Sequence, residues 1–217
     1  MNARTTDDPI HTVPMSDALR ALAGRGTPRK LRKGVQIITE GDRGDTLYIV
    51  LAGRLRAYSA APDGREVTYG EYGPGEYVGE LGLDGGLRSA NVETLAPSLC
   101  VIVTRPTLEA YLSENPAFAI ELLSKVIWLA RVATQNLQQM ALLRVYGRLR
   151  VLLERHALPQ ADGTRLWGPA ASHATIAGQL GCTRPMISRL MKDLERGGYI
   201  QVGRRRVLLL RGLPAKW

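Results

Sequence analysis

Residues 174–196 read ATIAGQLGCTRPMISRLMKDLER, and this stretch is typical of two helices joined by a tight turn. We expect the first helix over Ser172 to Leu180. Gly181 permits a left-handed turn after it, and Thr183 can cap the second helix. Apolar residues recur at helical spacing and predict one buried face on each helix: Ile176, Ala177 and Leu180 on the first, then Ile187, Leu190, Met191 and Leu194 on the second.

The opposite face of the second helix is short, basic and close to the helix N-terminus. It carries Arg184, Pro185, Ser188, Arg189 and Lys192. This arrangement is typical of a recognition helix that enters the major groove of DNA. There arginine can contact guanine through two hydrogen bonds, while serine and lysine can reach base edges or phosphates. The alternative is an ordinary helical hairpin with an exposed basic face.

The charge distribution favours the DNA-binding interpretation. The chain has 29 Lys and Arg against 20 Asp and Glu, a net charge of +9. Residues 144–217 hold 14 basic and 4 acidic residues, a net of +10, so residues 1–143 have 15 and 16, a net of −1. Such asymmetry predicts a near-neutral domain joined to a nucleic-acid-binding one. The following GGYIQVGRRRVLLL predicts a two-stranded wing, whose Arg204, Arg205 and Arg206 could touch phosphate or simply be solvated.

Composition excludes several other classes of protein. The chain has no run of about 18 apolar residues, so no membrane span is expected. The N-terminus lacks the apolar stretch of a signal peptide. We therefore expect a cytoplasmic protein. With only Cys100 and Cys182, a disulfide framework or thiolate metal site is not expected. Cys100 lies in the apolar run SLCVIV and is interpreted as a buried thiol. Residues 12–155 contain no histidine and only scattered carboxylates, so we predict no enzyme activity.

Upstream, residues 29–103 alternate short apolar runs with glycine turns. Strands at roughly 8–12-residue spacing predict a compact antiparallel barrel or sandwich, and Asp63-Gly64 predicts a hairpin turn. Before them, SDALRALAG predicts a short helix capped by Ser16. The sequence therefore predicts an α+β fold.

A long helix should follow from Pro116 to residue 143. Leu123, Val126, Ala130, Ala133, Leu137 and Met140 alternate spacings of three and four. This pattern is an a/d seam of about three heptads. The seam could pack on the chain's own barrel or on a partner copy, and its length favours a partner. A second, basic helix should resume near Arg144 and run to about His156.

The loop GELGLDGGLRSA, residues 79–90, is unusual in combining a glutamate, four glycines and an Arg-Ser pair. Its carboxylate and guanidinium could face one small ligand that carries a hydroxyl and an anionic group. Alternatively, Arg88 could form an ion pair with Glu80 or Asp84.

The chain resembles the CRP/FNR family of bacterial transcription regulators in the order of its parts, which is barrel, long helix and helix-turn-helix. The residues GELGL and RSA in the loop add to this resemblance. RVYGRLRVLL and GQLGCTRPMISRLMKDLE carry the resemblance further, over about Leu19 to Leu210. It implies an N-terminal cyclic-nucleotide-binding β-roll (a double-stranded jelly-roll barrel), a long dimerisation helix and a C-terminal winged helix-turn-helix. The expected divisions are a disordered tail (1–16), the β-roll (17–115), the dimerisation helix (116–143) and the DNA-binding domain (144–217).

The resemblance implies that loop 79–90 binds the cyclic phosphate of a nucleotide. Glu80 would accept from the ribose 2′-hydroxyl, and Arg88 and Ser89 would hold the phosphate. Backbone N–H groups from Gly79 to Leu81 could face the anion, and Ala90 completes the motif. On the long helix, Thr134 keeps a hydroxyl for the base, but Ala133 lacks one and Leu129 stands where the best-known member has arginine. The resemblance implies cyclic AMP as the first expectation, and the departures at Ala133 and Leu129 leave cyclic GMP, cyclic di-GMP and a ligand-independent regulator as alternatives. No metal is expected, and cysteine and histidine positions argue against iron–sulfur or haem sensing.

On the DNA side, Arg184, Arg189 and Lys192 match the readout and phosphate positions of the family. Ser172, His173 and Thr183 match its backbone-contact positions. Pro185 departs from a common glutamate that accepts from cytosine, which predicts altered or relaxed specificity at one base pair of each half-site. The resemblance implies a homodimer on a near-palindromic operator in double-stranded DNA, with RNA polymerase as a further partner. A hinge near residues 142–145 would place two recognition helices about 34 Å apart.

Overall fold

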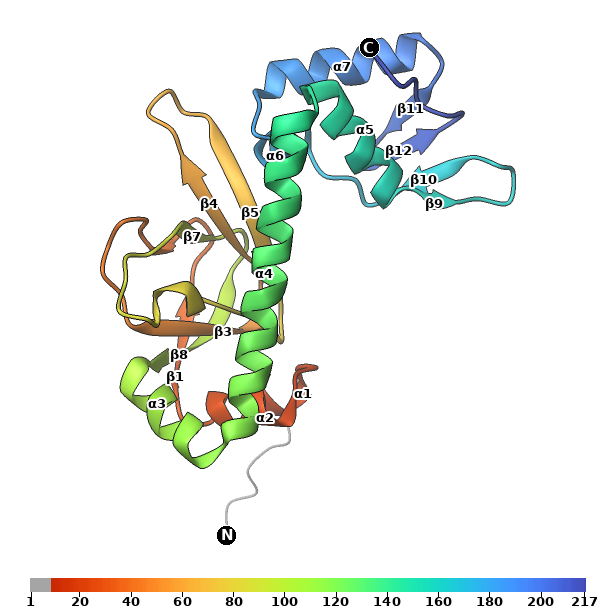
Figure 1. The fold of residues 1–217 in the computed structure, drawn as a ribbon. Helices are drawn as coiled ribbons and strands as arrows, with labels where there is room; N and C mark the ends of the chain where they lie inside the picture. The colour runs from red at the N-terminus through yellow and green to blue at the C-terminus, as the bar shows by residue number, and fades with distance from the viewer. Residues whose placement is uncertain (1–8) are drawn as a thin grey trace. The chain divides into compact units, whose positions relative to one another are not determined.

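The computed structural model describes residues 9–217. The chain forms two compact units, one from residues up to 59 and 68–131, and the other from 60–67 and 132–217 (Figure 1). The first contains two four-stranded sheets with their covering helices. The second contains the helix-turn-helix and a third sheet.

The two sheets of the first unit are built from short strands, as expected. One has the order β1 (Thr27–Leu31), β8 (Ser98–Thr104), β3 (Thr46–Ala52) and β6 (Tyr77–Val78). The other has the order β2 (Gln36–Ile38), β7 (Asn91–Thr94), β4 (Leu55–Ala60) and β5 (Glu66–Tyr72). The strand pairs are antiparallel. The Asp63-Gly64 turn forms as predicted, and Gly64 has a φ of +80°.

Strand β3 is apolar on both faces because both faces are buried. Leu47, Ile49 and Leu51 pack with the helices that cover the sheet. Val50 points the other way, into the core between the two sheets. Successive side chains of a strand alternate between faces. A continuous apolar run therefore marks a strand with a core on each side.

Short helices cover the first sheet: α1 (Pro9–Thr12), α2 (Asp17–Ala23) and α3 (Arg105–Glu114). Ser16 caps α2 as predicted, since its hydroxyl accepts from Leu19 N–H at 3.0 Å. A disordered tail was expected over residues 1–16, and residues 1–8 lie outside the described part of the chain. From residue 9 the structure differs from that expectation. Val13 is buried in the core beneath the helices, and Arg20 donates to the carbonyls of Ile10 and Val13. Side-chain anchoring by α2 therefore orders this segment.

Helix α4 (Pro116–Leu142) has two apolar stripes. Phe118 is buried against the first unit, and Leu122 packs partly against the same core. The predicted a/d seam lies on a different stripe, where Leu123 and Leu137 are 53% and 68% exposed. Leu123, the exposed leucine of the seam within the first unit, is therefore not covered by that unit's own core.

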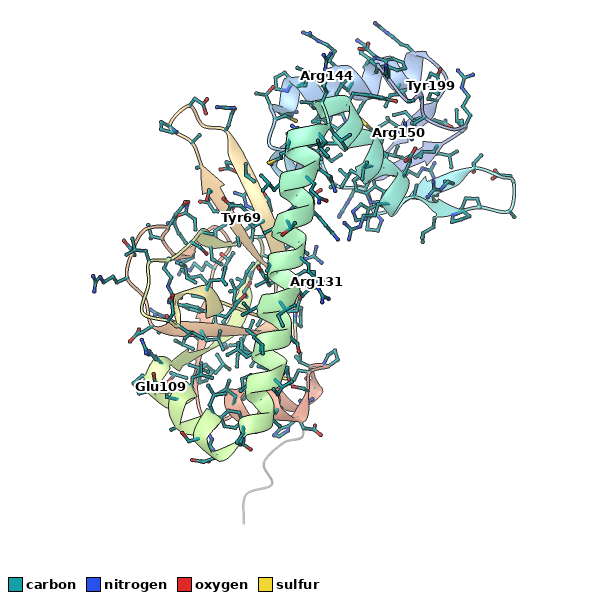
Figure 2. All side chains as sticks on the ribbon, in the orientation of Figure 1. Tyr69, Glu109, Arg131, Arg144, Arg150 and Tyr199 are labelled. Atoms are coloured by element: carbon teal, nitrogen blue, oxygen red, sulfur yellow. The ribbon has the colours of Figure 1, made fainter. Side chains whose placement is uncertain are left out.

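The predicted interruption after α4 is present. Helix α5 (Val145–His156) begins after Arg144, whose extended backbone (φ −67°, ψ 167°) breaks the helical path. Arg144 is labelled in Figure 2.

The second unit contains the predicted helix-turn-helix. Helix α6 (His173–Leu180) is capped by Ser172, Gly181 adopts the left-handed conformation (φ 60°), and α7 (Arg184–Arg196) follows. The four inward residues predicted for α7 are all buried. Thr183 occupies the cap position of α7, but its side chain makes no capping hydrogen bond.

The predicted wing belongs to a larger sheet. Strands β11 (Ile200–Gly203) and β12 (Arg206–Leu209) pair as expected, and β10 (Arg165–Trp167) and β9 (Leu158–Pro159) extend them to the order β11-β12-β10-β9. Trp167, Val207 and Leu209 bury one face of this sheet in the core of the second unit. Over residues 9–217, no helix combines the length and apolarity needed to cross a bilayer.

Candidate functional site

The loop from Gly79 to Ala90 joins β6 to β7 and begins with one helical turn, η1 (Glu80–Gly82). Gly79 has a φ of 103°, which glycine adopts without strain. A Cβ at this position would also lie 2.7 Å from the Thr46 carbonyl oxygen. Glycine is therefore required for the backbone to enter the loop along this path.

Arg88 is buried and is held by carbonyl groups instead of carboxylates. Its Nη1 donates to the Gly79 carbonyl at 2.8 Å, and its Nη2 donates to the carbonyl and hydroxyl oxygens of Thr46, both at 2.9 Å. Burial lowers its pKa, while Tyr48, Asp45 and Glu80 act in the opposite direction. Arginine nevertheless stays protonated in proteins. The loop therefore contains a fixed positive charge with no carboxylate in hydrogen-bond contact.

The internal ion pair left open by the sequence does not form between the described residues. Asp84 accepts a hydrogen bond from the Gly86 N–H at 2.8 Å instead of facing Arg88. Glu80 has another cation as its partner. The loop thus keeps its carboxylate and guanidinium separate.

Gly44 makes room for the guanidinium of Arg88. A Cβ on Gly44 would lie 2.1 Å from Arg88 Nε and 2.6 Å from its Cζ. Such distances are far below van der Waals contact, so alanine would push the guanidinium from its position. Gly44 belongs to the turn GDRGD, where sequence reasoning recognised only a turn.

Glu80 pairs with Lys125 of α4. Oε1 of Glu80 lies 3.7 Å from Lys125 Nζ, and the two side chains are 3% and 17% exposed. The second carboxylate oxygen of Glu80, Oε2, is buried without a hydrogen-bond partner. Lys125 also donates to the Tyr77 carbonyl. Burial lowers the pKa of Lys125, and Glu80 opposes this shift.

Two tyrosines lie under the lysine. Lys125 Nζ is 3.6 Å from the Tyr77 ring centroid and 5.2 Å from that of Tyr72. Burial raises the pKa of Tyr72 to about 12, with Glu80 adding to the effect. The Tyr77 hydroxyl is buried and has no hydrogen-bond partner. Two orphaned oxygens, on Tyr77 and Glu80, thus lie in the surroundings of one cation.

The remaining predicted ligand residues are more open. Leu81 and Ser89 are exposed, and Ala90 is partly buried beside the core between the sheets. Thr134 is exposed on α4 and belongs to the second unit. The first unit therefore brings together Gly79, Glu80 and Arg88, while Ser89 stays accessible at the loop surface.

Helix α7 presents the predicted basic face. Arg184, Pro185, Arg189 and Lys192 are exposed. Within residues 9–217, none of these cations has an ion pair with a carboxylate. Cations left without acidic partners on one helix face are suited to phosphate and base contacts.

Ser188 differs from the other predicted contacts because it is already bonded. Its hydroxyl lies 3.0 Å from His173 Nδ1, and both residues are partly buried. His173 is the first residue of α6, so this bond joins the two helices of the motif. The Ser172 hydroxyl accepts from Thr175 N–H at 3.1 Å as the cap of α6.

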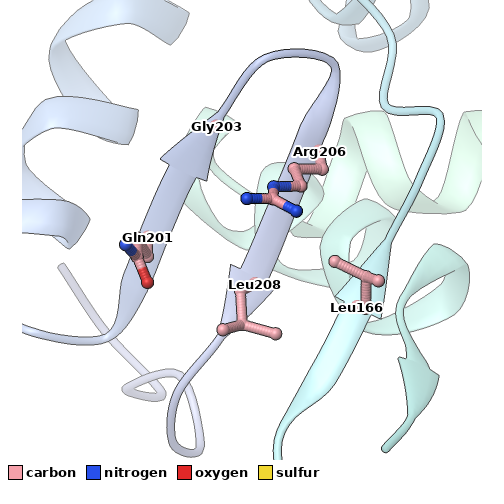
Figure 3. Close-up of a pocket in the computed structure, with 5 residues that line it drawn as sticks. All are labelled: Leu166, Gln201, Gly203, Arg206 and Leu208. Carbon is pink, nitrogen blue, oxygen red and sulfur yellow. The ribbon is translucent and has the colours of Figure 1, made fainter.

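A hollow of about 220 Å³ lies on the exposed face of the wing sheet (Figure 3). Leu166 and Leu208 form its apolar floor, and the Arg206 side chain extends over the sheet beside Gly203. No residue of loop 79–90 lines it. Arg206 is the basic residue that lines the hollow, and it follows Arg205 of the wing turn, which has a positive φ of 54°.

Comparison with family models agrees with both units. Residues 28–115 match the cyclic nucleotide-binding domain, and residues 144–213 match the Crp-like helix-turn-helix domain. The chain belongs to the CRP/FNR family of transcription regulators. DNA binding and a cyclic nucleotide-binding domain in the first unit follow from this membership.

Curated relatives cover most of the chain. The CRP-like cAMP-activated global transcriptional regulator of Mycobacterium tuberculosis is 28% identical over 198 residues, 88% of each chain. The cAMP-activated global transcriptional regulator Vfr of Pseudomonas aeruginosa is 28% identical over 176 residues, covering 76% of this chain and 81% of the relative.

Solved structures support the fold. The c-di-GMP responsive global regulator CLP of Xanthomonas campestris has a TM-score of 0.75 at 21% identity, covering 88% of this chain and 97% of that one. A CooA mutant from Carboxydothermus hydrogenoformans has a TM-score of 0.76 at 18% identity, covering 92% and 94%. At these identities the likeness concerns the fold alone.

Sequence reasoning missed Lys125, Gly44, Thr46 and Tyr77 around the loop. Gly44 acts through the space that its missing Cβ leaves, and Thr46 through its carbonyl and hydroxyl oxygens. Neither contact can be inferred from the local sequence. Lys125 is one of the two cations of α4, with Arg131, and it stands within the mostly apolar run 122–130 of that helix. A lysine within such a run was the available signal.

The two buried tyrosine hydroxyls of the first unit offer a test of this geometry. Tyr77→Phe removes an orphaned hydroxyl, so its free energy of unfolding should be unchanged or slightly higher. Tyr111→Phe removes a hydroxyl that donates to the Ala18 carbonyl at 2.7 Å, and it should cost about 1 kcal/mol. Urea unfolding of the ligand-free protein followed by circular dichroism would measure both. Equal losses in the two variants would contradict the orphaned state of Tyr77.

Proposed function

We propose that this protein is a homodimeric regulator that binds its operator in double-stranded DNA under the control of a cyclic nucleotide, with cyclic AMP as the effector. The observation that carries the proposal is the pair of buried groups on one loop: the Arg88 guanidinium without a carboxylate partner, and the free Oε2 of Glu80. Together they supply a cation for a phosphodiester and an acceptor for a hydroxyl. Cyclic nucleotides carry both of these groups on adjacent atoms of one ring system.

Cyclic AMP is chosen because the curated relatives that cover most of this chain are cAMP-activated regulators. In the proposed complex, Arg88 holds the phosphate by charge, and the exposed Ser89 donates to it as a neutral group. Glu80 accepts from the ribose 2′-hydroxyl. Thr134 contacts the base, whereas Ala133 and Leu129 provide no polar group for it.

The exposed seam of α4 supports the proposed homodimer. Leu123, Leu137 and Met140 are 53%, 68% and 42% exposed at a/d positions. Apolar side chains repeated at a/d positions are stabilised when a second helix covers them. A second copy of α4 carries the same seam and makes a symmetric partner.

In this dimer, ligand and DNA binding are coupled through the arrangement of the two chains. The ligand can act only by binding more tightly to the DNA-competent state. Two recognition helices then enter successive major grooves about 34 Å apart. RNA polymerase is the proposed partner of the DNA-bound regulator.

Titration calorimetry with cyclic AMP, cyclic GMP and cyclic di-GMP tests the effector. We expect micromolar binding of cyclic AMP that weakens about 100-fold in Arg88→Ala, because charge-assisted bonds to the phosphate are lost. Arg54→Ala, which removes a surface arginine of the same unit paired with Glu71, is the control and should bind as the unchanged protein does. A preference for either comparator, or binding that survives Arg88→Ala, would refute the assignment.

Sedimentation velocity tests the homodimer. Leu137→Glu places two carboxylates against each other at the seam and should yield a monomer. Gln138→Glu adds the same charge at the next position of α4, away from the seam, and should leave the dimer intact. A dimer that persists in Leu137→Glu would show that the seam is not the interface.

Binding-site selection tests the role of Pro185. Proline lacks an acceptor for a base, so we expect a weak preference at one base pair of each half-site. Pro185→Glu adds a carboxylate that can accept from a cytosine amino group and should restore about 1–3 kcal/mol of discrimination there. Pro185→Ala removes the ring without adding an acceptor and should remain relaxed. A strong preference at that position in the unchanged protein would contradict this account.

A further inference from the structure

Lys125 is a largely buried cation of the first unit that takes no part in the proposed nucleotide contacts. Its side chain is 17% exposed and sits between Glu80, the Tyr77 carbonyl and the Tyr77 ring. A lysine loses side-chain entropy and hydration when it is held in this way. The contacts that offset this loss come from Tyr77, which leads into loop 79–90, and from Glu80 within the loop.

The two oxygens of Glu80 are divided between different environments. Oε1 faces Lys125 Nζ at 3.7 Å, whereas Oε2 is buried and has no partner. A carboxylate can accept several hydrogen bonds, and a buried acceptor left without a donor is unfavourable. Lys125 therefore fixes one oxygen and leaves the other available to a donor from outside the chain.

We infer that Lys125 is a positioning residue for the effector: it holds Glu80 through Oε1 and so directs Oε2 toward a hydroxyl donor of the ligand. This inference rests on the proposed function, because the donor is the ribose 2′-hydroxyl of the cyclic nucleotide. Lys125 does not contact the ligand and acts on it only through Glu80. The site then distinguishes ribose from deoxyribose in proportion to how firmly the lysine holds the carboxylate.

The fixed position of Lys125 supports this role. The ammonium group is held by a carbonyl and an aromatic face in addition to Glu80, so the carboxylate is oriented before a ligand arrives. Preorganised acceptors lose less entropy on binding than mobile ones. If Lys125 is removed, Glu80 loses its ion-pair partner within the described part of the chain, and its side chain can turn away from the ligand.

Calorimetric titration of the full-length protein with cyclic AMP and 2′-deoxy cyclic AMP tests the inference. The unchanged protein should prefer cyclic AMP by about 10- to 100-fold, the range of a hydrogen bond to a charged group. In Lys125→Met this preference should fall below about threefold, mainly through weaker binding of cyclic AMP. Lys125→Arg keeps the charge and should retain more of the preference. Adding Lys125→Met to Glu80→Gln should change the preference no further, because both act on one bond.

Arg131→Met is the matched control, since Arg131 is an exposed cation on the same helix (Figure 2). It should leave the preference unchanged, and thermal melting would verify that every variant is folded. Equal losses for both nucleotides in Lys125→Met would assign the lysine a purely structural role. Tighter binding of cyclic AMP would show that it competes with the ligand for Glu80; either result overturns the inference. If the unchanged protein binds neither nucleotide, the proposed function itself fails and the inference falls with it.

Discussion

The cost of burying charge shapes the first unit more than any other constraint. Transferring an ion from water into a protein interior is unfavourable unless hydrogen bonds or an opposite charge compensate it. Arg88 is compensated by two backbone carbonyls and a hydroxyl, and Lys125 by a carboxylate, a carbonyl and a ring. Glu80 is compensated on one oxygen only. The loop is therefore stable enough to keep a definite shape and still has unused binding capacity for an anion and a donor.

That compensation depends on backbone positions as much as on charged side chains. Carbonyl groups can surround a guanidinium only if the chain approaches it closely, and Gly44 and Gly79 allow this approach because they lack a Cβ. The same groups that hold Arg88 also prevent it from collapsing onto Glu80. The positions of Gly44 and Gly79 and the position of the Arg88 guanidinium therefore depend on each other, and a change in either disturbs the other.

The fold was largely predictable because its signals are periodic. Alternating apolar runs predicted the strands, Ser16 predicted the start of α2, and helical spacing predicted the buried face of α7. The ordering of residues 9–16 was missed, since it depends on Arg20 reaching back to two carbonyls. The wing was predicted as two strands because its partners β9 and β10 are only two and three residues long. Strands so short carry almost no pattern of their own.

The candidate site was predictable only where a local motif marks it. Glu80 and Arg88 stand in one conspicuous loop, but Lys125 lies about 40 positions away and meets Glu80 only through the packing of α4 on the first unit. The resemblance directed attention to Leu129, where a cation was missing. The cation found in the structure is one helical turn earlier on the same helix. Comparison position by position therefore did not identify Lys125 as the partner of Glu80.

The residues proposed to bind the phosphate and ribose differ in burial from those proposed to meet the base. The groups proposed to bind phosphate and ribose all lie in the first unit, and the two charged ones, Glu80 and Arg88, are buried. The positions proposed to meet the base, Ala133 and Thr134, are exposed on α4 beyond that unit. Buried groups are constrained by each other, because removing one leaves its partners unsatisfied. Ala133 and Thr134 are not among the groups that hold Glu80 or Arg88 in place. The contacts of Glu80, Arg88 and Lys125 therefore determine the class of ligand that the loop can bind. Substitutions at the base-contact positions of α4 can change the preferred base and leave those contacts intact.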